Sequence, residues 1–385
     1  MFATIGRLRE GIPSTLNAFC TSDYRNGSSP HLWGFPNYEV NTLTDSDYDE
    51  QGDYRHKQSS QPAYTEEILR FISVYHPTVD DKCDRVFLLD TGVIRTTDDK
   101  RFHVQKPSII VFGLPSNGCA SRNFPLIQKI EIPDELYNDP LGIVYLHLDF
   151  QPKGGCDDLM IYITNTFDHS IIVFDYAKND FWLFANHSSL VPVPGEDQIG
   201  DYVIEYGILS ATLGWPDKKG NRIFYYAPGA STAGYAVTTK TLKNRRKSSA
   251  HYYGSEFRIV GYLGCAGNNH RLFFDPTCGV MFFGQMNSGA VKCWNVAKPY
   301  NPSNIATVFQ SQDDELFTDV FVDSEGYLWM HSSKVHKILA SQEPLDLHQV
   351  NSATYKVKVQ DAIRGTVCEN DGYPDDEITW QYLVE

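Results

Sequence analysis

The stretch VFLLDTG (86–92) carries the residues most suggestive of chemistry. An apolar run ending in Asp90-Thr91-Gly92 is how an aspartic protease presents its catalytic carboxylate, but that chemistry needs two such loops whose carboxylates share one proton. A second loop is absent, because VDSEG (322–326) has an extra residue before its glycine. Asp90 therefore stays a weak general-base candidate, and the sequence favours a hydrogen-bonding turn residue at a strand end.

Metal and cofactor chemistry find no support in the histidines. The twelve histidines form no HxxxH or HxH pair. His331 and His336 are interpreted as surface or channel-lining residues rather than metal ligands. We expect no metal and no cofactor, and the chain shows no nucleophile–base pair for an enzymatic mechanism.

The cysteines favour an oxidising compartment. There are eight, too dispersed for a CxxC pair, and an even number of dispersed cysteines is typical of disulfides in secreted proteins. Two sequons, at Asn26 and Asn186, are compatible with glycosylation. The start, MFATIGRLREGIPSTLNAF, has no long apolar centre, so we expect a secreted protein whose leader is missing from this sequence.

The net charge of the chain excludes some classes of binding partner. The formal net charge is −15, which argues against a nucleic-acid or anionic-membrane binder. The one basic cluster, KTLKNRRK (240–247), is predicted to be a solvated turn. No run of 18 apolar residues is present, so no membrane-spanning segment is predicted. An acidic body suits cationic small molecules or basic partners.

Short strand-like runs dominate the chain after an irregular, polar start (1–65). Five blocks share one pattern, in which a turn opens a bulky apolar strand, a small polar break follows, and a second apolar strand comes next. The predicted strands are 85–94, 107–115, 127–133, 158–166, 169–184, 221–228, 234–242, 279–287, 290–296, 326–333 and 334–339. Helical periodicity is nearly absent; 65–72 could form a helical turn or two, or a strand.

Repeated strand pairs without intervening helices predict an all-β fold, a six-bladed β-propeller with a central channel. Packing blades side by side buries faces and edges that a single blade leaves bare. Seven blades, or a pair of β-sandwiches, are the alternatives. LLDTG occupies the same place in its block as YITNT, YYAPG, FFGQM and MHSS in theirs, the end of a blade strand.

Four segments carry a resemblance to the yellow and major royal jelly protein family of insects. KCDRVFLLDTG (82–92), RIFYYAPGASTAGYAVTTKTLKN (222–244), AVKCWNVAKPY (290–300) and LFTDVFVDSEGYLWMHSS (316–333) each resemble a family segment, in the same order. The resemblance runs from residue 1 to about residue 370. It implies one propeller over 1–370, a tail over 371–385, a secretory leader, and an N-terminal strand missing before Met1.

The resemblance also implies disulfides Cys83–Cys156 and Cys293–Cys368. Cys265 and Cys278 flank a segment in which a hairpin could join them, so a third bridge is predicted there. Cys20 with Cys119 would then be the fourth by elimination.

Salivary members of the family bind biogenic amines in the channel, where polar groups hold the ammonium and an aromatic ring packs on the ligand. Three positions of that pattern fall here on Thr318, which is kept, and on Ser333 and Val335, which replace an asparagine and a large apolar residue. These departures predict a weaker or different ligand. Asn165 and Gln285, at equivalent strand ends, are also expected to face the channel.

Three functions follow from the resemblance. The first is a secreted, non-enzymatic propeller that acts in cuticle or eggshell hardening, pigmentation or amine capture, with extracellular matrix proteins as further partners. The second is a melanin-pathway enzyme that converts dopachrome as an isomerase or tautomerase. The third, a nutrient or storage protein, is least favoured because the chain lacks a repeat-rich or nitrogen-rich tail.

Overall fold

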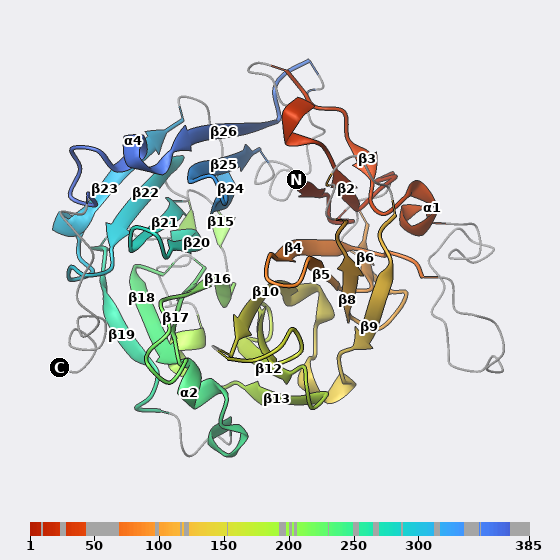
Figure 1. The fold of residues 1–385 in the computed structure, drawn as a ribbon, viewed down its shortest axis with the longest axis horizontal. Coiled ribbons are helices and arrows are strands. Elements are labelled where there is room, and N and C mark those ends of the chain that lie inside the picture. The colour runs from red at the N-terminus through yellow and green to blue at the C-terminus, as the bar shows by residue number, and fades with distance from the viewer. Residues whose placement is uncertain are drawn as a thin grey trace. The chain divides into compact units, whose positions relative to one another are not determined.

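The computed structural model is built mainly of antiparallel β-strands with a few short helices (Figure 1). The residues that the structure describes are 1–8, 11–23, 28–43, 69–96, 100–115, 118, 123–151, 153–191, 198–199, 202–203, 206–229, 231–248, 254–264, 269–285, 288–311, 316–334, 346 and 348–369.

Six sheets of three or four strands occur among the described residues, and together they are the six-bladed β-propeller that the sequence predicts. The first three sheets are β1–β2–β3 (Phe2–Thr4, Leu16–Ala18, Trp33–Gly34), β4–β5–β8–β9 (Val74–Asp80, Arg85–Asp90, Ser108–Gly113, Leu126–Glu131) and β10–β11–β12–β13 (Ile143–Phe150, Leu159–Asn165, Ser170–Asp175, Asp180–Phe184). The next three are β16–β17–β18–β19 (Ile208–Leu213, Ile223–Pro228, Ala233–Thr238, Arg258–Tyr262), β20–β21–β22–β23 (Asn269–Asp275, Val280–Gln285, Ala290–Asn295, Ile305–Gln310) and β24–β25–β26 (Leu316–Val322, Tyr327–Ser333, Ser352–Lys358).

Smaller elements connect or extend these sheets. They are the hairpins β6–β7 (Val93–Arg95, Arg101–His103) and β14–β15 (Gln198–Ile199, Tyr202–Val203) and the helices α1 (Tyr38–Asn41), α2 (Thr239–Leu242) and α4 (Val359–Ile363). No described helix is long and apolar enough to cross a membrane.

The second and third strands of the four-stranded sheets were predicted, but 169–184 merges β12 with β13 and 234–242 runs on into α2. The first strands of these sheets were missed, and the irregular start predicted for 1–65 is wrong over β1, β2 and β3. The five segments aligned as strand ends (LLDTG, YITNT, YYAPG, FFGQM and MHSS) do contain strand ends. The last residues of β5, β11, β17, β21 and β25 are Asp90, Asn165, Pro228, Gln285 and Ser333. Each of the missed strands β4, β10, β16, β20 and β24 has a bulge that interrupts its pairing with the next strand. The helical turn or strand predicted at 65–72 is wrong over its described half, because residues 69–72 form neither helix nor strand. The predicted strand at 334–339 lies outside the described residues except for Lys334.

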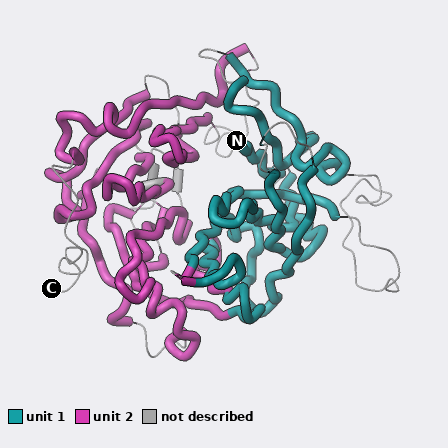
Figure 2. The backbone as a smooth tube through the Cα atoms, viewed as in Figure 1, with its two compact units in different colours: residues 1–150, 154–165, 175–181 teal, residues 151–153, 166–174, 182–385 magenta. Residues whose placement is uncertain are grey.

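Two compact units divide the chain (Figure 2). Unit 1 comprises residues 1–150, 154–165 and 175–181, and unit 2 comprises residues 151–153, 166–174 and 182–385. In unit 1, aromatic and aliphatic side chains of the first two sheets share one core around Phe35, Phe71 and Phe112. In unit 2, the core between the last two sheets includes Phe282, Phe317 and Met330.

Hydroxyl side chains join successive sheets. The first strand of a sheet has a row of backbone N–H groups with no strand beyond it, and such groups are costly when left unsatisfied. In unit 2, Phe274 N–H on β20 donates to Thr212 Oγ1 on β16 over 3.1 Å, and Leu272 N–H donates to Ser210 Oγ. In unit 1, Val74 N–H on β4 donates to Thr15 Oγ1 over 2.9 Å.

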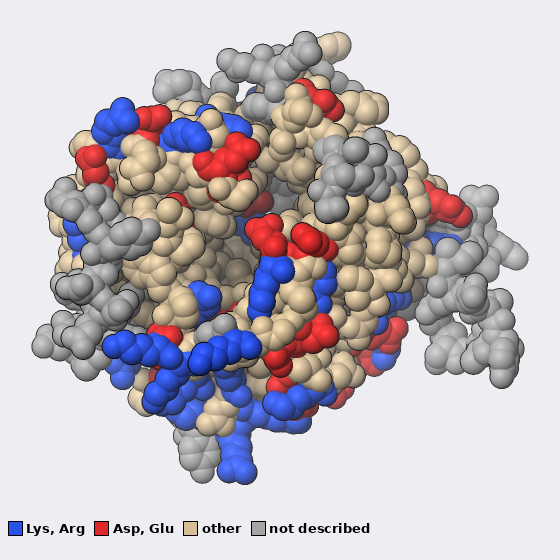
Figure 3. All heavy atoms as spheres, in the orientation of Figure 1, with Lys and Arg blue, Asp and Glu red and all other residues tan. Residues whose placement is uncertain are grey.

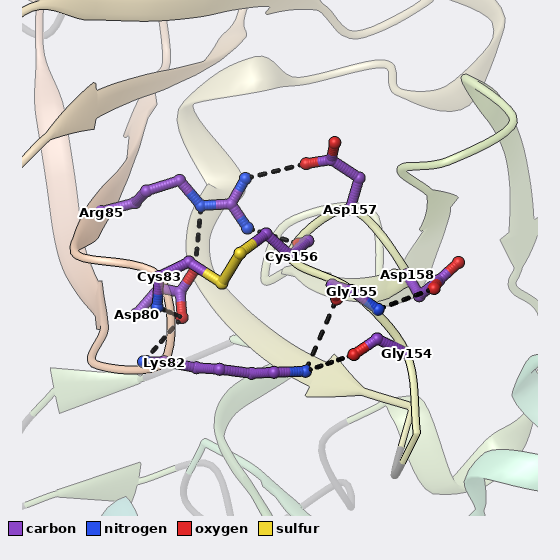
Figure 4. The surroundings of a disulfide bond; sticks show 9 residues. All are labelled: Asp80, Lys82, Cys83, Arg85, Gly154, Gly155, Cys156, Asp157 and Asp158. Carbon is purple, nitrogen blue, oxygen red and sulfur yellow. Dashed lines mark hydrogen bonds and ion pairs between the residues drawn. A yellow bond between two sulfur atoms is a disulfide. The ribbon is translucent and has the colours of Figure 1, made fainter.

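The disulfide Cys83–Cys156 in unit 1 sits within a polar network (Figure 4). Arg85 is buried beside it, donates to Asp80 Oδ2 at 2.9 Å and Asp157 Oδ1 at 3.0 Å, and also donates to the Cys156 carbonyl. Lys82 Nζ donates to the Gly154 carbonyl at 2.7 Å. The bridge and these bonds join the turn after β4 to the turn before β11.

The other cysteines differ from one another in whether they form a disulfide. Cys293–Cys368 forms as the resemblance implies. Cys20 is also half of a disulfide, and its partner lies outside the described residues, so the Cys20–Cys119 pairing stays a prediction. The predicted Cys265–Cys278 bridge is wrong: Cys278 keeps its thiol, which donates to Asp275 Oδ2 over 3.3 Å. Burial and the adjacent Asp275 raise the pKa of this thiol to about 12, so it stays protonated and poorly reactive. Cys265 itself lies outside the described residues.

Replacing Cys83 and Cys156 together by Ala is expected to lower the free energy of unfolding by about 2–5 kcal/mol, because the bridge closes a loop with a sequence separation of 73. Denaturant titration of the full chain checks this. Cys278→Ala, which removes a buried thiol but no bridge, is the control. An equal or smaller loss in the double variant than in the control would contradict the prediction.

Candidate functional site

Asp90, the sequence's candidate base, is buried and fully engaged by hydrogen bonds. Its carboxylate accepts from Ile72 N–H (2.7 Å), Ser73 N–H (2.9 Å), Gly92 N–H (2.9 Å) and Gln105 Nε2 (3.1 Å), and the residue is 1 % exposed. Burial raises the pKa of Asp90, and the bonds from Ser73, Gly92 and Ile72 oppose this rise. A carboxylate so enclosed has no face left for a substrate, which supports the turn-residue interpretation.

Thr91 and Gly92 complete the structural reason for the DTG string. Thr91 N–H donates to the Ser73 carbonyl at 3.0 Å. Gly92 has φ +68°, and a Cβ there would lie 2.0 Å from the Gln105 carbonyl oxygen. The turn therefore requires glycine on two grounds, conformation and close backbone approach.

Arg7 holds the same segment from its other side. The guanidinium is 1 % exposed and donates to the carbonyls of Phe71 (2.9 Å) and Ile72. Asp90 thus binds the N–H groups of the segment entering β4 while Arg7 binds its carbonyls. Arg7 lies close enough to lower the pKa of Asp90 as well.

The polar groups of unit 2 offer a more accessible site. Among the first strands of its three sheets, β20 contacts both β16 and β24. Each has a bulge near its start, between Ile208 and Ser210, between His270 and Leu272, and between Phe317 and Asp319. The bulges take Leu209, Arg271 and Thr318 out of the regular ladders. Bulges of this kind re-aim side chains and are frequent beside functional sites.

An ion pair joins two of these strands. Arg271 Nη2 and Nε on β20 both donate to Asp319 Oδ1 on β24, at 2.6 and 3.2 Å. The Arg271 side chain is 10 % exposed and that of Asp319 is 39 % exposed. The pair therefore presents a partly solvated carboxylate beside a mostly buried guanidinium, next to the half-buried Thr318.

The structure places two of the predicted ligand residues in one sheet. The Thr318 hydroxyl donates to the His331 carbonyl at 3.5 Å, and Ser333 on β25 pairs with Leu316 on β24. Val335 lies outside the described residues.

Two further predicted residues are buried at their strand ends. Gln285, in the neighbouring sheet of unit 2, accepts from Ser288 Oγ at 2.7 Å. Asn165, in unit 1, donates to the Asp139 carbonyl at 3.4 Å. Both amides therefore have structural partners, and their role toward a ligand stays a prediction.

The two histidines singled out from the sequence are His331 and His336. His331 lies between Thr354 Oγ1 (Nδ1, 2.8 Å) and Ser352 Oγ (Nε2, 3.1 Å) on β26. His336 lies outside the described residues. Across the part of the chain that the structure describes, no group of three His, Cys, Asp or Glu side chains could hold a metal ion.

Sequence reasoning missed Arg271 and Asp319. A signal was present, because Arg271 starts the otherwise apolar run RLFF and Asp319 follows Thr318 within a strand-like segment. Charged residues beside buried positions of a strand need a partner or a function. Their pairing could not be anticipated, since 48 positions separate them.

The six sheets define a β-propeller protein, and comparison with known sequences gives its family. The model of the major royal jelly protein family matches residues 72–368, so the chain belongs to that family, as the four segments indicated. It is 30 % identical over 377 residues to the yellow-related salivary protein SP03 of Phlebotomus perniciosus, covering 96 % of this chain and 84 % of that one.

Two other similar proteins have names of different kinds, one an enzyme and one a salivary protein. The L-dopachrome tautomerase yellow-f of Drosophila melanogaster is 28 % identical over 374 residues, 96 % of this chain and 79 % of that one. The yellow-related salivary protein ASP4 of Phlebotomus orientalis is 32 % identical over 316 residues, 78 % of this chain and 74 % of that one.

Asp90→Asn is expected to lower the free energy of unfolding by about 1–3 kcal/mol, because an amide NH₂ would face the Ile72 or Ser73 N–H donor. Denaturant titration at neutral pH gives the value. Asp81→Asn, at an exposed position of the turn after β4, is the matched control and should change it little. An Asp90→Asn variant as stable as the control would refute the structural role.

Proposed function

We propose that this protein is a secreted β-propeller that captures a small aromatic ligand bearing an amine, without converting it. The observation that carries the proposal is the partly exposed Asp319 carboxylate beside Thr318 on the first strand β24. A carboxylate with a neighbouring hydroxyl suits an ammonium group, since charge-assisted hydrogen bonds are the stronger kind.

Two further observations support the proposal, one on the lack of conversion of the ligand and one on secretion. The Thr318 hydroxyl donates to a backbone carbonyl and Asp319 pairs with Arg271, so these two residues do not form the hydrogen-bonded nucleophile and base of covalent catalysis. Asn186, in a sequon, is exposed, which a glycosylation site requires. The salivary relatives support secretion.

Dopachrome conversion is the second candidate, and one observation favours it. Arg271 beside Asp319 offers both signs of charge within 2.6 Å. A ligand with a carboxylate as well as a ring nitrogen, such as L-dopachrome, matches both groups better than a simple amine does. The similarity to yellow-f points the same way.

Calorimetric titration of the full chain with serotonin, dopamine and L-dopachrome tests the proposal. We expect saturable binding of at least one of them, weakened about tenfold by Asp319→Asn, which is a loss of about 1.4 kcal/mol. Asp361→Asn is the matched control: Asp361 pairs with Arg364 at the same 2.6 Å, but on α4. That variant should bind as the natural chain does.

Dopachrome absorbance, followed in parallel, separates the two candidates. Loss of absorbance above the spontaneous rate would replace capture by catalysis. Absence of both binding and turnover would refute both and favour a matrix role through the protein surface.

A further inference from the structure

A run of basic residues in unit 2 lies at the surface, in the connection between two strands of one sheet. This basic run, KNRRK (243–247), belongs to the segment that leads from β18 to β19. Asn244, Arg245 and Arg246 are exposed. Figure 3 shows Lys and Arg side chains gathered over α2, which comes just before the basic run. Exposed connections of this kind are the preferred places for a protease to cut a folded chain.

The sequence predicts a solvated turn over 240–247, and the structure divides this segment into two parts. The first part, α2, is anchored: the Leu242 side chain is fully buried, and the Leu242 carbonyl accepts from Trp182 Nε1 at 2.8 Å. The second part is a 3-10 turn, Arg245–Ser248, in which no residue is buried. Opening this turn therefore exposes no apolar core to water, and α2 can stay in place.

Hydrogen bonds within the 3-10 turn join residues that are close in sequence. The Lys247 N–H donates to the Asn244 carbonyl at 2.8 Å, and the Arg246 N–H donates to Asn244 Oδ1 at 3.2 Å. Ser248 Oγ donates to the Arg245 carbonyl at 2.8 Å. Because exposed backbone with local bonds opens at low cost, a protease can draw this turn into its active site without unfolding the sheet.

The chain has two other places with adjacent basic residues, and both lie within shorter connections. Arg101, which follows Lys100, is already paired with β6 as the first residue of β7. Lys218 and Lys219 lie in the turn between β16 and β17, where Asp217 Oδ1 accepts from the Lys219 N–H at 2.8 Å. That connection spans only 214–222, whereas the basic run lies in one that spans 239–257. Extending either of these two places would pull apart the strands beside it.

A break in the basic run leaves the sheet intact. β18 and β19 are antiparallel neighbours in one sheet, and they lie on opposite sides of the basic run in the sequence. The bridge Cys83–Cys156 comes before the run and the bridge Cys293–Cys368 comes after it, so neither joins the two sides. Strand pairing and packing therefore hold the two fragments together after a cut.

We propose that the peptide bond between Arg246 and Lys247 is a processing site for a serine protease of the secretory pathway that cuts after adjacent basic residues. Such a protease binds the two arginines with carboxylates, which guanidinium groups fit closely, and Lys243 adds a third positive charge. The reaction is hydrolysis: the C–N bond breaks, and one water supplies a hydroxyl to the Arg246 carbonyl carbon and a hydrogen to the Lys247 nitrogen. The site is independent of the amine site proposed above.

Incubation of the full, folded chain with a purified proprotein convertase of the subtilisin type tests the proposal. Reducing gel electrophoresis and mass spectrometry identify the products. We expect 1–246 and 247–385 as the first fragments. Size-exclusion chromatography of the cut protein without denaturant should show the two fragments eluting together, because β18 and β19 stay paired.

Two double variants separate recognition of this site from general cleavage. Arg245→Gln with Arg246→Gln should slow cleavage at least about tenfold, because the protease loses both charged side chains that it recognises. Lys218→Gln with Lys219→Gln removes the same charge from the turn between β16 and β17 and should leave the rate unchanged. Thermal unfolding shows whether both variants fold, and Arg246→Ala alone replaces the first pair if it does not.

Three outcomes would overturn the proposal. One is a folded chain that resists the protease while the urea-unfolded chain is cut after Arg246, which would show that the turn does not open. Another is a first cut after Arg101 or Lys219. The third is an equal rate in the two double variants. Fragments that separate without denaturant would contradict the expected association of the cut chain.

Discussion

The unpaired N–H groups of the first strand of a sheet are the constraint on which much of this structure depends. Each is a buried or half-buried donor that no further strand can satisfy. The chain meets this need with side chains from neighbouring segments: Thr15 for Val74, and Ser210 and Thr212 for Leu272 and Phe274. Asp90 does the same for Ile72 and Ser73, which come just before β4. Polar residues buried at these places are therefore architectural.

The same constraint explains why a protease-like string occurs in a protein of another kind. Asp90 and Thr91 make bonds that hold the segment entering β4, and Gly92 allows the close approach of the Gln105 carbonyl. A general base must keep one lone pair available to a substrate, whereas this carboxylate is enclosed by four donors. The residue types and their spacing suggested a catalytic carboxylate. The burial of Asp90 and the number of its hydrogen-bond donors show that its role is structural instead.

An ion pair in unit 2 is built into the packing of two sheets. Arg271 and Asp319 lie on strands of neighbouring sheets, so their charges are largely balanced within the fold. The Arg271 side chain is mostly buried while the Asp319 side chain is partly exposed, so the carboxylate is the member of the pair that solvent reaches.

The sequence by itself determined the blade pattern, because apolar runs and turn residues are local properties of the chain, and the order of four motifs indicated the family. The bridges Cys83–Cys156 and Cys293–Cys368 were implied by that resemblance, and the structure confirms them. Only the tertiary structure decided that Cys278 keeps its thiol, that Asp90 is enclosed, and that Arg271 meets Asp319. These outcomes depend on which segments distant in sequence come within hydrogen-bonding distance. Local pattern carries no information about such meetings, since the packing of whole sheets and the bulges in their first strands set them.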